Sequence, residues 1–157
     1  MRRAAILVAG VAAVSAAALV AIAQGDEATG VTFMGEPVTA AEIALGQEVY
    51  AQTCASCHGA DLEGQPDWRR RLDNGRMPAP PHDETGHTWH HADGQLFTIT
   101  KHGVEAVVPG YESDMPAFEG VLSDAEIRAV LAYIKSTWPE RERGFQAEVT
   151  ANDEASE

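Results

Sequence analysis

Apolar side chains recur with the period of an α-helix in two parts of the chain. The clearer stripe has members at i, i+3, i+4, i+7 and i+11, namely Ile127, Val130, Leu131, Ile134 and Trp138. It follows Ser123-Asp124-Ala125-Glu126, which has the form of a capping box, and Pro139 ends it. We therefore predict an amphipathic helix over residues 124–137.

A second capping box, Thr39-Ala40-Ala41-Glu42, begins the other helical segment. One face of this segment carries Ile43, Gly46, Val49, Tyr50 and Thr53, which predicts a helix over about residues 40–53. Gly46 lies in its middle, where glycine costs about 1 kcal/mol relative to alanine. Either the helix simply tolerates this cost, or, as we favour, another helix crosses so closely at Gly46 that a Cβ atom would not fit.

Between these helices the pattern is mostly irregular. Residues 59–91 are rich in Gly, Pro, His and Asp, and the run Met77-Pro78-Ala79-Pro80-Pro81 excludes a helix there. A short helix is predicted from about residue 94 to 102, with Asp93 as its N-cap and Gly103 as its stop. Loops this long in compact domains often wrap around something, and a bound cofactor would serve.

We predict one domain over residues 39–139, with a separate segment on each side of it. Residues 24–38 are polar and contain glycine, which is typical of a linker. Residues 140–157 are charged and lose the helical period, which predicts an acidic, disordered tail. With no convincing strands, the expected fold class is all-α, with three main helices and long loops.

The N-terminus has the form of an export signal. Arg2 and Arg3 precede the uncharged residues 4–23, and Ala21-Ile22-Ala23 predicts removal of residues 1–23 as a signal peptide. The alternative is an uncleaved membrane anchor formed by residues 4–23, which are long enough to span a bilayer. Either way the domain lies outside the cytoplasm, periplasmic or otherwise exported, and only the uncleaved anchor would attach it to a membrane.

The net charge restricts the class of partner. The chain has 24 acidic and 11 basic residues, for a formal net charge of −13. Such a field repels phosphate backbones and anionic headgroups, which argues against a nucleic-acid partner. A partner protein with a basic docking surface fits better, although the same charge also serves solubility.

The chain's two cysteines, Cys54 and Cys57, are followed directly by His58 in the C-x-x-C-H form of c-type haem attachment. Two thiols at this spacing can reach two neighbouring vinyl groups of one porphyrin, and the histidine can reach the iron from the same side. A thioredoxin-like redox pair would follow a strand, and a structural zinc site would need two further ligands at short spacing. Covalent haem is the interpretation we favour over these two.

An iron bound by His58 needs a ligand on its other face, and Met115 is the best candidate. Met115 lies in a loop 57 residues downstream, and a thioether favours the reduced metal. Met77 is a chemical competitor, but only 19 residues separate it from His58, which leaves little chain to reach the far face. Other ligand candidates are His82, His87, His90, His91 and His102. If Met115 is not a ligand, it fills a gap in the core, as methionines usually do.

These motifs resemble those of class I, mono-haem c-type cytochromes, from about Thr39 to Trp138. The resemblance rests on a helix followed by CASCHG, on MPAF around Met115, and on the terminal LSDAEIRAVLAYIKSTWP. It implies a class I cytochrome c-like fold around one covalent haem c, with His58 and Met115 as axial ligands. It also implies that the first and last helices cross at Gly46, Tyr50 and Tyr133, and that a carbonyl of Pro80 or Pro81 accepts the His58 N–H. The long segment between Trp68 and His91 departs from simple members.

The function implied is electron transfer between redox partner proteins, without enzymatic activity. One alternative is a ligand sensor or peroxidase-like enzyme, which would need a weak or absent Met115 bond to the iron. Another is metal handling by the four histidines of residues 82–91, whose imidazoles suit copper. Arg69, Arg70 and Arg71 form the one strongly basic run, which is a solvated turn, a contact to haem propionates or a docking site.

Overall fold

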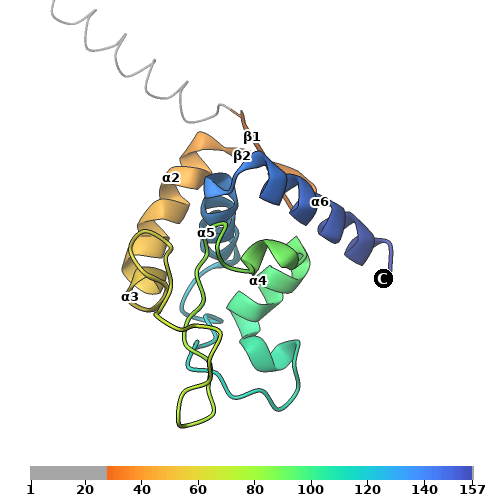
Figure 1. The fold of residues 1–157 in the computed structure, drawn as a ribbon. Helices are drawn as coiled ribbons and strands as arrows, with labels where there is room; N and C mark the ends of the chain where they lie inside the picture. The colour runs from red at the N-terminus through yellow and green to blue at the C-terminus, as the bar shows by residue number, and fades with distance from the viewer. Residues whose placement is uncertain (1–27, 157) are drawn as a thin grey trace, which may run out of the picture.

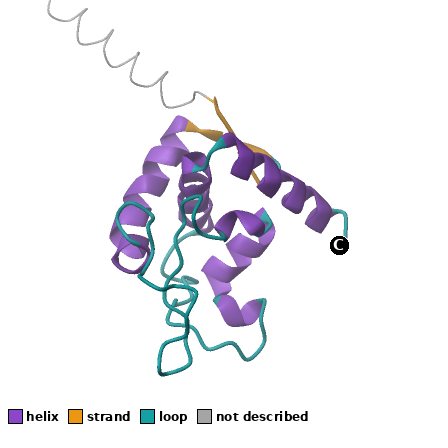
Figure 2. Ribbon diagram, in the orientation of Figure 1, coloured by secondary structure: helices purple, strands orange, loops and turns teal. Residues whose placement is uncertain are grey.

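The computed structural model describes residues 28–156, which are mainly helical (Figures 1 and 2). The strands and α-helices are β1 (Ala28–Phe33), β2 (Glu36–Thr39), α2 (Ala40–Val49), α3 (Ala55–His58), α4 (Asp93–His102), α5 (Asp124–Thr137) and α6 (Glu140–Glu154). A π-helical turn, Tyr50–Cys54, joins α2 to α3, and 3-10 turns cover Thr88–His90 and Val104–Ala106. The predicted signal peptide or anchor, residues 1–23, lies outside the described residues. Within residues 28–156, no helix has the length and apolarity needed to cross a membrane.

The predicted helices form, and both capping boxes close. The Thr39 hydroxyl accepts from the N–H of Glu42 at 3.2 Å, and the Glu42 carboxylate accepts from the N–H of Thr39 at 2.9 Å. Ser123 and Glu126 make the same pair of bonds at the start of α5. Each box satisfies backbone donors that have no partner inside the helix, which fixes where the helix begins.

Helices α2 and α5 cross at Gly46, as predicted. A Cβ added to Gly46 would overlap the carbonyl oxygen of Ala129 and lie 2.8 Å from the Cβ of Tyr133. One turn further along, the rings of Tyr50 and Tyr133 pack with centroids 5.7 Å apart. The core built around this crossing is fully buried, with exposures of 2% or less at Phe33, Val38, Tyr50, Ile127, Val130 and Trp138.

Residues 28–38, predicted as part of a linker, instead form an antiparallel hairpin of β1 and β2. Met34 and Gly35 both have positive φ and make its turn. Phe33 and Val38 are fully buried beneath it, while Arg128 of α5 donates to the Phe33 carbonyl at 2.7 Å. The hairpin is therefore packed into the core through Phe33 and Val38 and hydrogen-bonded to α5.

Residues 140–154, predicted as disordered tail, instead form α6, so a fourth long helix joins the three that were expected. Its buried face is polar: Glu142, Gln146 and Thr150 follow one another at i+4 spacing. Gln146 donates to the Asp93 carboxylate at 2.6 Å, and the Thr150 hydroxyl accepts from the N–H of Asp93 at 3.1 Å. Hydrogen bonds to α4, rather than apolar burial, thus attach this helix.

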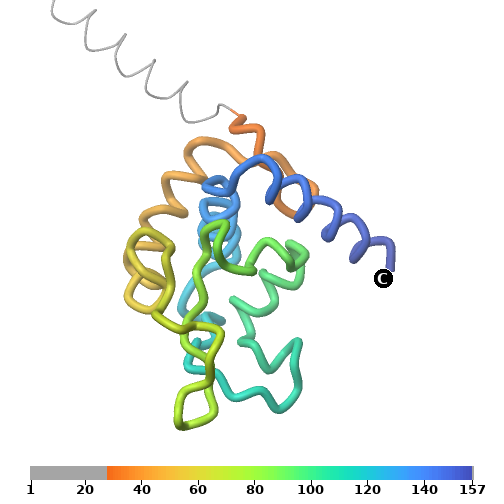
Figure 3. The backbone as a smooth tube through the Cα atoms, in the orientation of Figure 1, coloured from red at the N-terminus to blue at the C-terminus, as the bar shows by residue number. Residues whose placement is uncertain are grey.

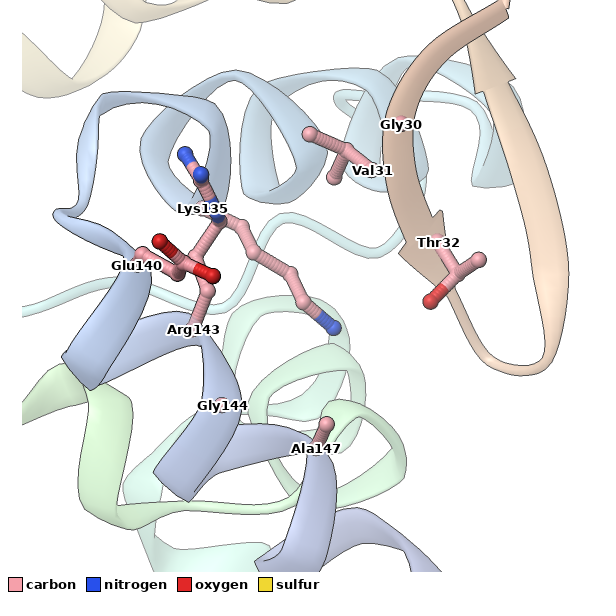
Figure 4. A pocket seen from close by; sticks show the side chains of 8 residues that line it. All are labelled: Gly30, Val31, Thr32, Lys135, Glu140, Arg143, Gly144 and Ala147. Carbon is pink, nitrogen blue, oxygen red and sulfur yellow. The ribbon is translucent and has the colours of Figure 1, made fainter.

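A shallow cavity of about 320 Å³ lies where the hairpin, the end of α5 and α6 meet (Figure 4). Its lining consists of Gly30, Val31, Thr32, Lys135, Glu140, Arg143, Gly144 and Ala147. None of the residues predicted to hold haem is among them. The Lys135 side chain in this lining is paired with Asp93.

Candidate haem-binding site

A continuous helical path carries Cys54, Cys57 and His58 into position. Helix α2 widens into the π-helical turn Tyr50–Cys54, and α3 then presents the second cysteine and the histidine. Thr53 supports the turn by donating its hydroxyl to the Val49 carbonyl at 2.6 Å. Turns of this kind inside α-helices are frequent at functional sites, and the sequence pattern did not distinguish this one from an ordinary α-helix.

His58 is oriented by a backbone carbonyl. Its Nδ1–H donates to the carbonyl oxygen of Pro80 at 2.9 Å, which decides between Pro80 and Pro81 for this contact. Since a carbonyl only accepts, Nδ1 carries the proton and Nε2 keeps the lone pair that a metal ion needs. The side chain is 7% exposed, and this burial lowers the pKa of His58, which keeps the ring neutral.

The imidazole ring of His82 stacks on that of His58. The His58 and His82 rings are stacked with centroids 3.9 Å apart. His82 is fixed in turn: its Nδ1 lies 2.8 Å from the Thr88 hydroxyl, and its carbonyl accepts from the Trp138 indole N–H at 2.7 Å. Burial, with His58 and His87 nearby, lowers the pKa of His82 well below its ordinary value. The residue that ends α5 therefore supports His58 through a second imidazole.

The loop after His58 returns to it through two glycines packed against prolines. Gly64 donates its N–H to the His58 carbonyl at 2.7 Å, and a Cβ there would overlap the Pro80–Pro81 backbone. Gly86 approaches the Pro81 carbonyl just as closely. These contacts set the position of the Pro80 carbonyl and hence the orientation of the histidine ring.

Met115 lies on a different segment, the loop between the turn Val104–Ala106 and α5. The loop is tied to the last turn of α4, because Phe118 and Glu119 donate their N–H groups to its carbonyls at 3.1 and 2.9 Å. Met115 is half-buried. Arg76, in the loop after His58, forms an ion pair with Asp114, the residue before Met115. The loop that follows His58 and the loop that carries Met115 therefore meet at one end of the molecule (Figure 3).

The other histidines predicted as ligands are held by contacts of their own, and His87 and His91 meet edge to face with centroids 5.4 Å apart. His87 stacks on Trp68 with centroids 5.3 Å apart, and His90 stacks on Trp89 with centroids 3.8 Å apart. His91 lies 2.9 Å from the Gln95 amide oxygen through its Nδ1. Within residues 28–156, no group of three or more His, Cys, Asp or Glu side chains is arranged to hold a metal ion.

The donor set fits a covalently bound haem. Cys54 and Cys57 are not joined by a disulfide; the first is half-buried and the second exposed. Burial raises the pKa of the Cys54 thiol, which is opposite to the shift of a redox-active thiol. The two flanking loops also expose Leu72, Val108 and Val121, which are apolar side chains of the kind that a porphyrin covers.

Comparison with known proteins agrees with haem binding. The family described as Cytochrome c matches residues 43–138. The chain is 31% identical over 105 residues to the cbb3-type cytochrome c oxidase subunit CcoP of Rhodobacter capsulatus, covering 65% of this chain and 31% of that protein. It is 27% identical over 95 residues to subunit FixP of Bradyrhizobium sp. (strain ORS 278), covering 60% of this chain and 27% of the relative. The match thus spans about a third of these relatives, and no solved structure matches the chain significantly.

Proposed function

Because the chain belongs to the cytochrome c family, we propose that it transfers single electrons through one covalently bound haem c outside the cytoplasm. Cys54 and Cys57 would hold the porphyrin by thioether bonds, and His58 and Met115 would be the axial ligands. When bound, the haem iron supplies a one-electron redox couple whose potential depends on these ligands and on burial. The protein would act as a carrier and not as an enzyme.

The hydrogen bond from His58 to Pro80 is the observation that carries this proposal. It leaves Nε2 facing away from the supporting carbonyl and makes the imidazole a better electron donor. Tyr50 adds rigidity, since its hydroxyl donates to the Gly59 carbonyl at 2.8 Å, one residue after the ligand. A rigid ligand suits electron transfer because the surroundings then rearrange little between two oxidation states.

Met115 as the second ligand rests on its chemistry and its place in the chain. A thioether stabilises the reduced iron, and Met/His ligation raises the reduction potential. Its loop is anchored to α4 and paired with the His58 loop through Asp114. Met77 is less suited, because it lies three residues from Pro80 on the segment that supports His58 from behind.

The partners proposed are other redox proteins. The curated relatives are named as subunits of cbb3-type cytochrome c oxidases, and a terminal oxidase is accordingly one electron acceptor to test. Export through residues 1–23, cleaved or retained as an anchor, is part of the same proposal.

The first experiment is the visible spectrum of the reduced holoprotein with and without carbon monoxide. We expect a low-spin spectrum that the gas leaves unchanged, and a haem-to-protein ratio of one in alkaline pyridine. Replacement of Met115 by alanine should make the iron reactive towards carbon monoxide, whereas replacement of Met77 by alanine should not. Ready binding of carbon monoxide by the unmodified protein would instead favour a sensor or peroxidase-like enzyme.

A further inference from the structure

The basic run Arg69–Arg71 leads into the tip, residues 72–76, of the loop that leaves and returns to His58, the yellow-green loop at the bottom of Figure 1. The tip is a defined turn: the N–H of Leu72 donates to the Arg76 carbonyl at 2.8 Å, and the N–H of Gly75 donates to the Leu72 carbonyl at 2.9 Å. All three arginines are exposed. The charges are therefore presented to solvent on a structured support.

These arginines have no carboxylate partner, unlike most of the other cations within residues 28–156. Nine of the eleven lysines and arginines fall within residues 28–156. Five of the nine are ion-paired with Asp or Glu, namely Arg76, Lys101, Arg128, Lys135 and Arg141, and Arg143 donates to a backbone carbonyl. Four cations of the described part of the chain therefore lack an acidic partner: Arg143, which stands alone on α6, and the three consecutive arginines of the run.

The contacts that the run does make leave its charge available. Arg69 lies over the Trp68 ring at 4.1 Å and donates to the Thr85 carbonyl at 3.3 Å. Arg71 donates to the Gly75 carbonyl at 2.6 Å. Asp67 and Asp73 flank the run in sequence, yet neither forms an ion pair with it.

The position of the run connects it to the candidate haem site. Arg76, at the base of the same turn, is paired with Asp114 beside Met115. The run thus belongs to the loop that is joined to the Met115 loop by the Arg76–Asp114 ion pair. A charged group at this place acts on the approach of a redox partner more strongly than the distant charges that make up the net value of −13.

We infer that Arg69–Arg71 is a docking surface for an acidic patch on a redox partner protein. This inference rests on the proposed electron-transfer function and names the partner's chemistry at that site. The partner's docking surface is thus acidic, whereas the net charge of this chain alone favoured a partner with a basic surface. Local complementarity of charge governs encounter and orientation, while the acidic remainder of the surface disfavours other approaches.

Arg70→Glu is the informative variant, because no ion pair or side-chain hydrogen bond involves Arg70 within residues 28–156. The matched control is Ala147→Glu with Ala151→Glu, two exposed positions on α6, which lies at the opposite end of the view in Figure 1. Both variants change the net charge by the same amount. They differ only in where the change is made.

The measurement is the rate at which ferricyanide, a trianion, takes one electron from the reduced holoprotein over a range of ionic strengths. For the unmodified protein we expect the rate to fall as salt is added, which is the sign of attraction. Arg70→Glu should lower the rate at low salt about fivefold, and the α6 control should leave it nearly unchanged. Tris(phenanthroline)cobalt(III), a trication, should react faster with Arg70→Glu. A polyglutamate peptide should slow ferricyanide oxidation of the unmodified protein more than that of Arg70→Glu.

Three results would overturn the inference. A ferricyanide rate that rises with salt in the unmodified protein would show that net charge controls the approach. Equal effects of Arg70→Glu and the α6 control would show the same. A change in haem spectrum or midpoint potential that accounts for the rate would assign the run to the haem's own surroundings. Failure of the proposed function is distinct, since the protein would then lack covalent haem or would bind carbon monoxide before any rate is measured.

Discussion

Asp93 and Lys135 form a buried ion pair that joins the start of α4 to the end of α5. The Lys135 ammonium lies 3.0 Å from both carboxylate oxygens of Asp93, and the two side chains are 6% and 2% exposed. The same carboxylate accepts from the N–H of Met34 at 2.9 Å and from the Gln146 amide at 2.6 Å. One buried carboxylate thus connects the hairpin, α4, α5 and α6.

Lys135→Met should therefore destabilise the protein by about 3–5 kcal/mol, because it leaves the Asp93 charge buried without its cation. Asp93→Asn combined with Lys135→Met removes both charges and should cost less than the single change. Chemical denaturation of the holoprotein measures both. Lys101→Met is the control: it removes an ion pair whose Asp124 side chain is 66% exposed, and it should cost less than about 1 kcal/mol. If Lys135→Met costs as little stability as the control, the buried Asp93–Lys135 ion pair does not stabilise the fold as proposed.

The sequence allowed the helices to be predicted where apolar period and capping boxes agree. Both α2 and α5 begin at the residue that their capping boxes indicate. The close crossing of a second helix at Gly46 was inferred from the free-energy cost of a glycine inside a helix. Such signals are local and carry their own physical reason. The C-x-x-C-H motif is local in the same sense, which is why Cys54, Cys57 and His58 could be named as a unit.

What the sequence did not predict depends on contacts between distant residues. Helix α6 lacks an apolar stripe, and its buried Gln146 and Thr150 look solvated until Asp93 is placed beside them. Asp93 was expected as an N-cap, but its side chain turns inward to Lys135. The hairpin had a signal that a period-2 reading would detect, since Val31 and Phe33 alternate before the Met34-Gly35 turn.

Gly46→Ala should destabilise the protein by about 1–3 kcal/mol, even though alanine is the better helix former. The added methyl group would overlap the Ala129 carbonyl, so α2 and α5 would have to separate. Gly144→Ala is the matched control, because it also lies in a helix but has no atom within 4 Å of the new Cβ. That change should stabilise by about 0.5–1 kcal/mol. Thermal denaturation of the two variants should give shifts of opposite sign, and shifts of the same sign would argue against a tight crossing.

Gly64→Ala should raise the reduction potential of the holoprotein. The added Cβ would displace Pro80 and Pro81, which weakens the hydrogen bond that makes His58 a strong electron donor to the iron. A weaker donor stabilises the oxidised iron less. The measurement is a redox titration followed by visible absorption.

Gly75→Ala separates this effect from backbone strain. Gly75 also has a positive φ, of 84°, but no atom lies within 4 Å of its added Cβ. The control variant should lose some stability and keep its potential. If both variants shift the potential equally, the cause is strain in the loop and not the carbonyl of Pro80.

Glu42→Gln should destabilise the protein at neutral pH by about 1 kcal/mol, and this difference should disappear in acid. The Thr39 backbone N–H, with the Arg128 guanidinium at 3.0 Å, lowers the pKa of Glu42 below its ordinary value of 4.5. A lowered pKa means that the carboxylate stabilises the fold above pH 4.5, and that this contribution is lost as the pH falls through the folded-state pKa. Denaturation at pH 7 and again below pH 4 measures the difference.

Glu126→Gln is the matched control for that change. Glu126 closes an equivalent capping box with Ser123, whose hydroxyl lowers the pKa of Glu126, but no cation within residues 28–156 is paired with it. Glutamine can keep the capping bonds in both helices, so the control should lose less stability at pH 7 than Glu42→Gln. Equal losses in the two variants would show that the capping box, and not Arg128, accounts for the contribution of Glu42. A larger loss at Glu42 would place that contribution in the ion pair that connects α2 to α5, beneath the hairpin.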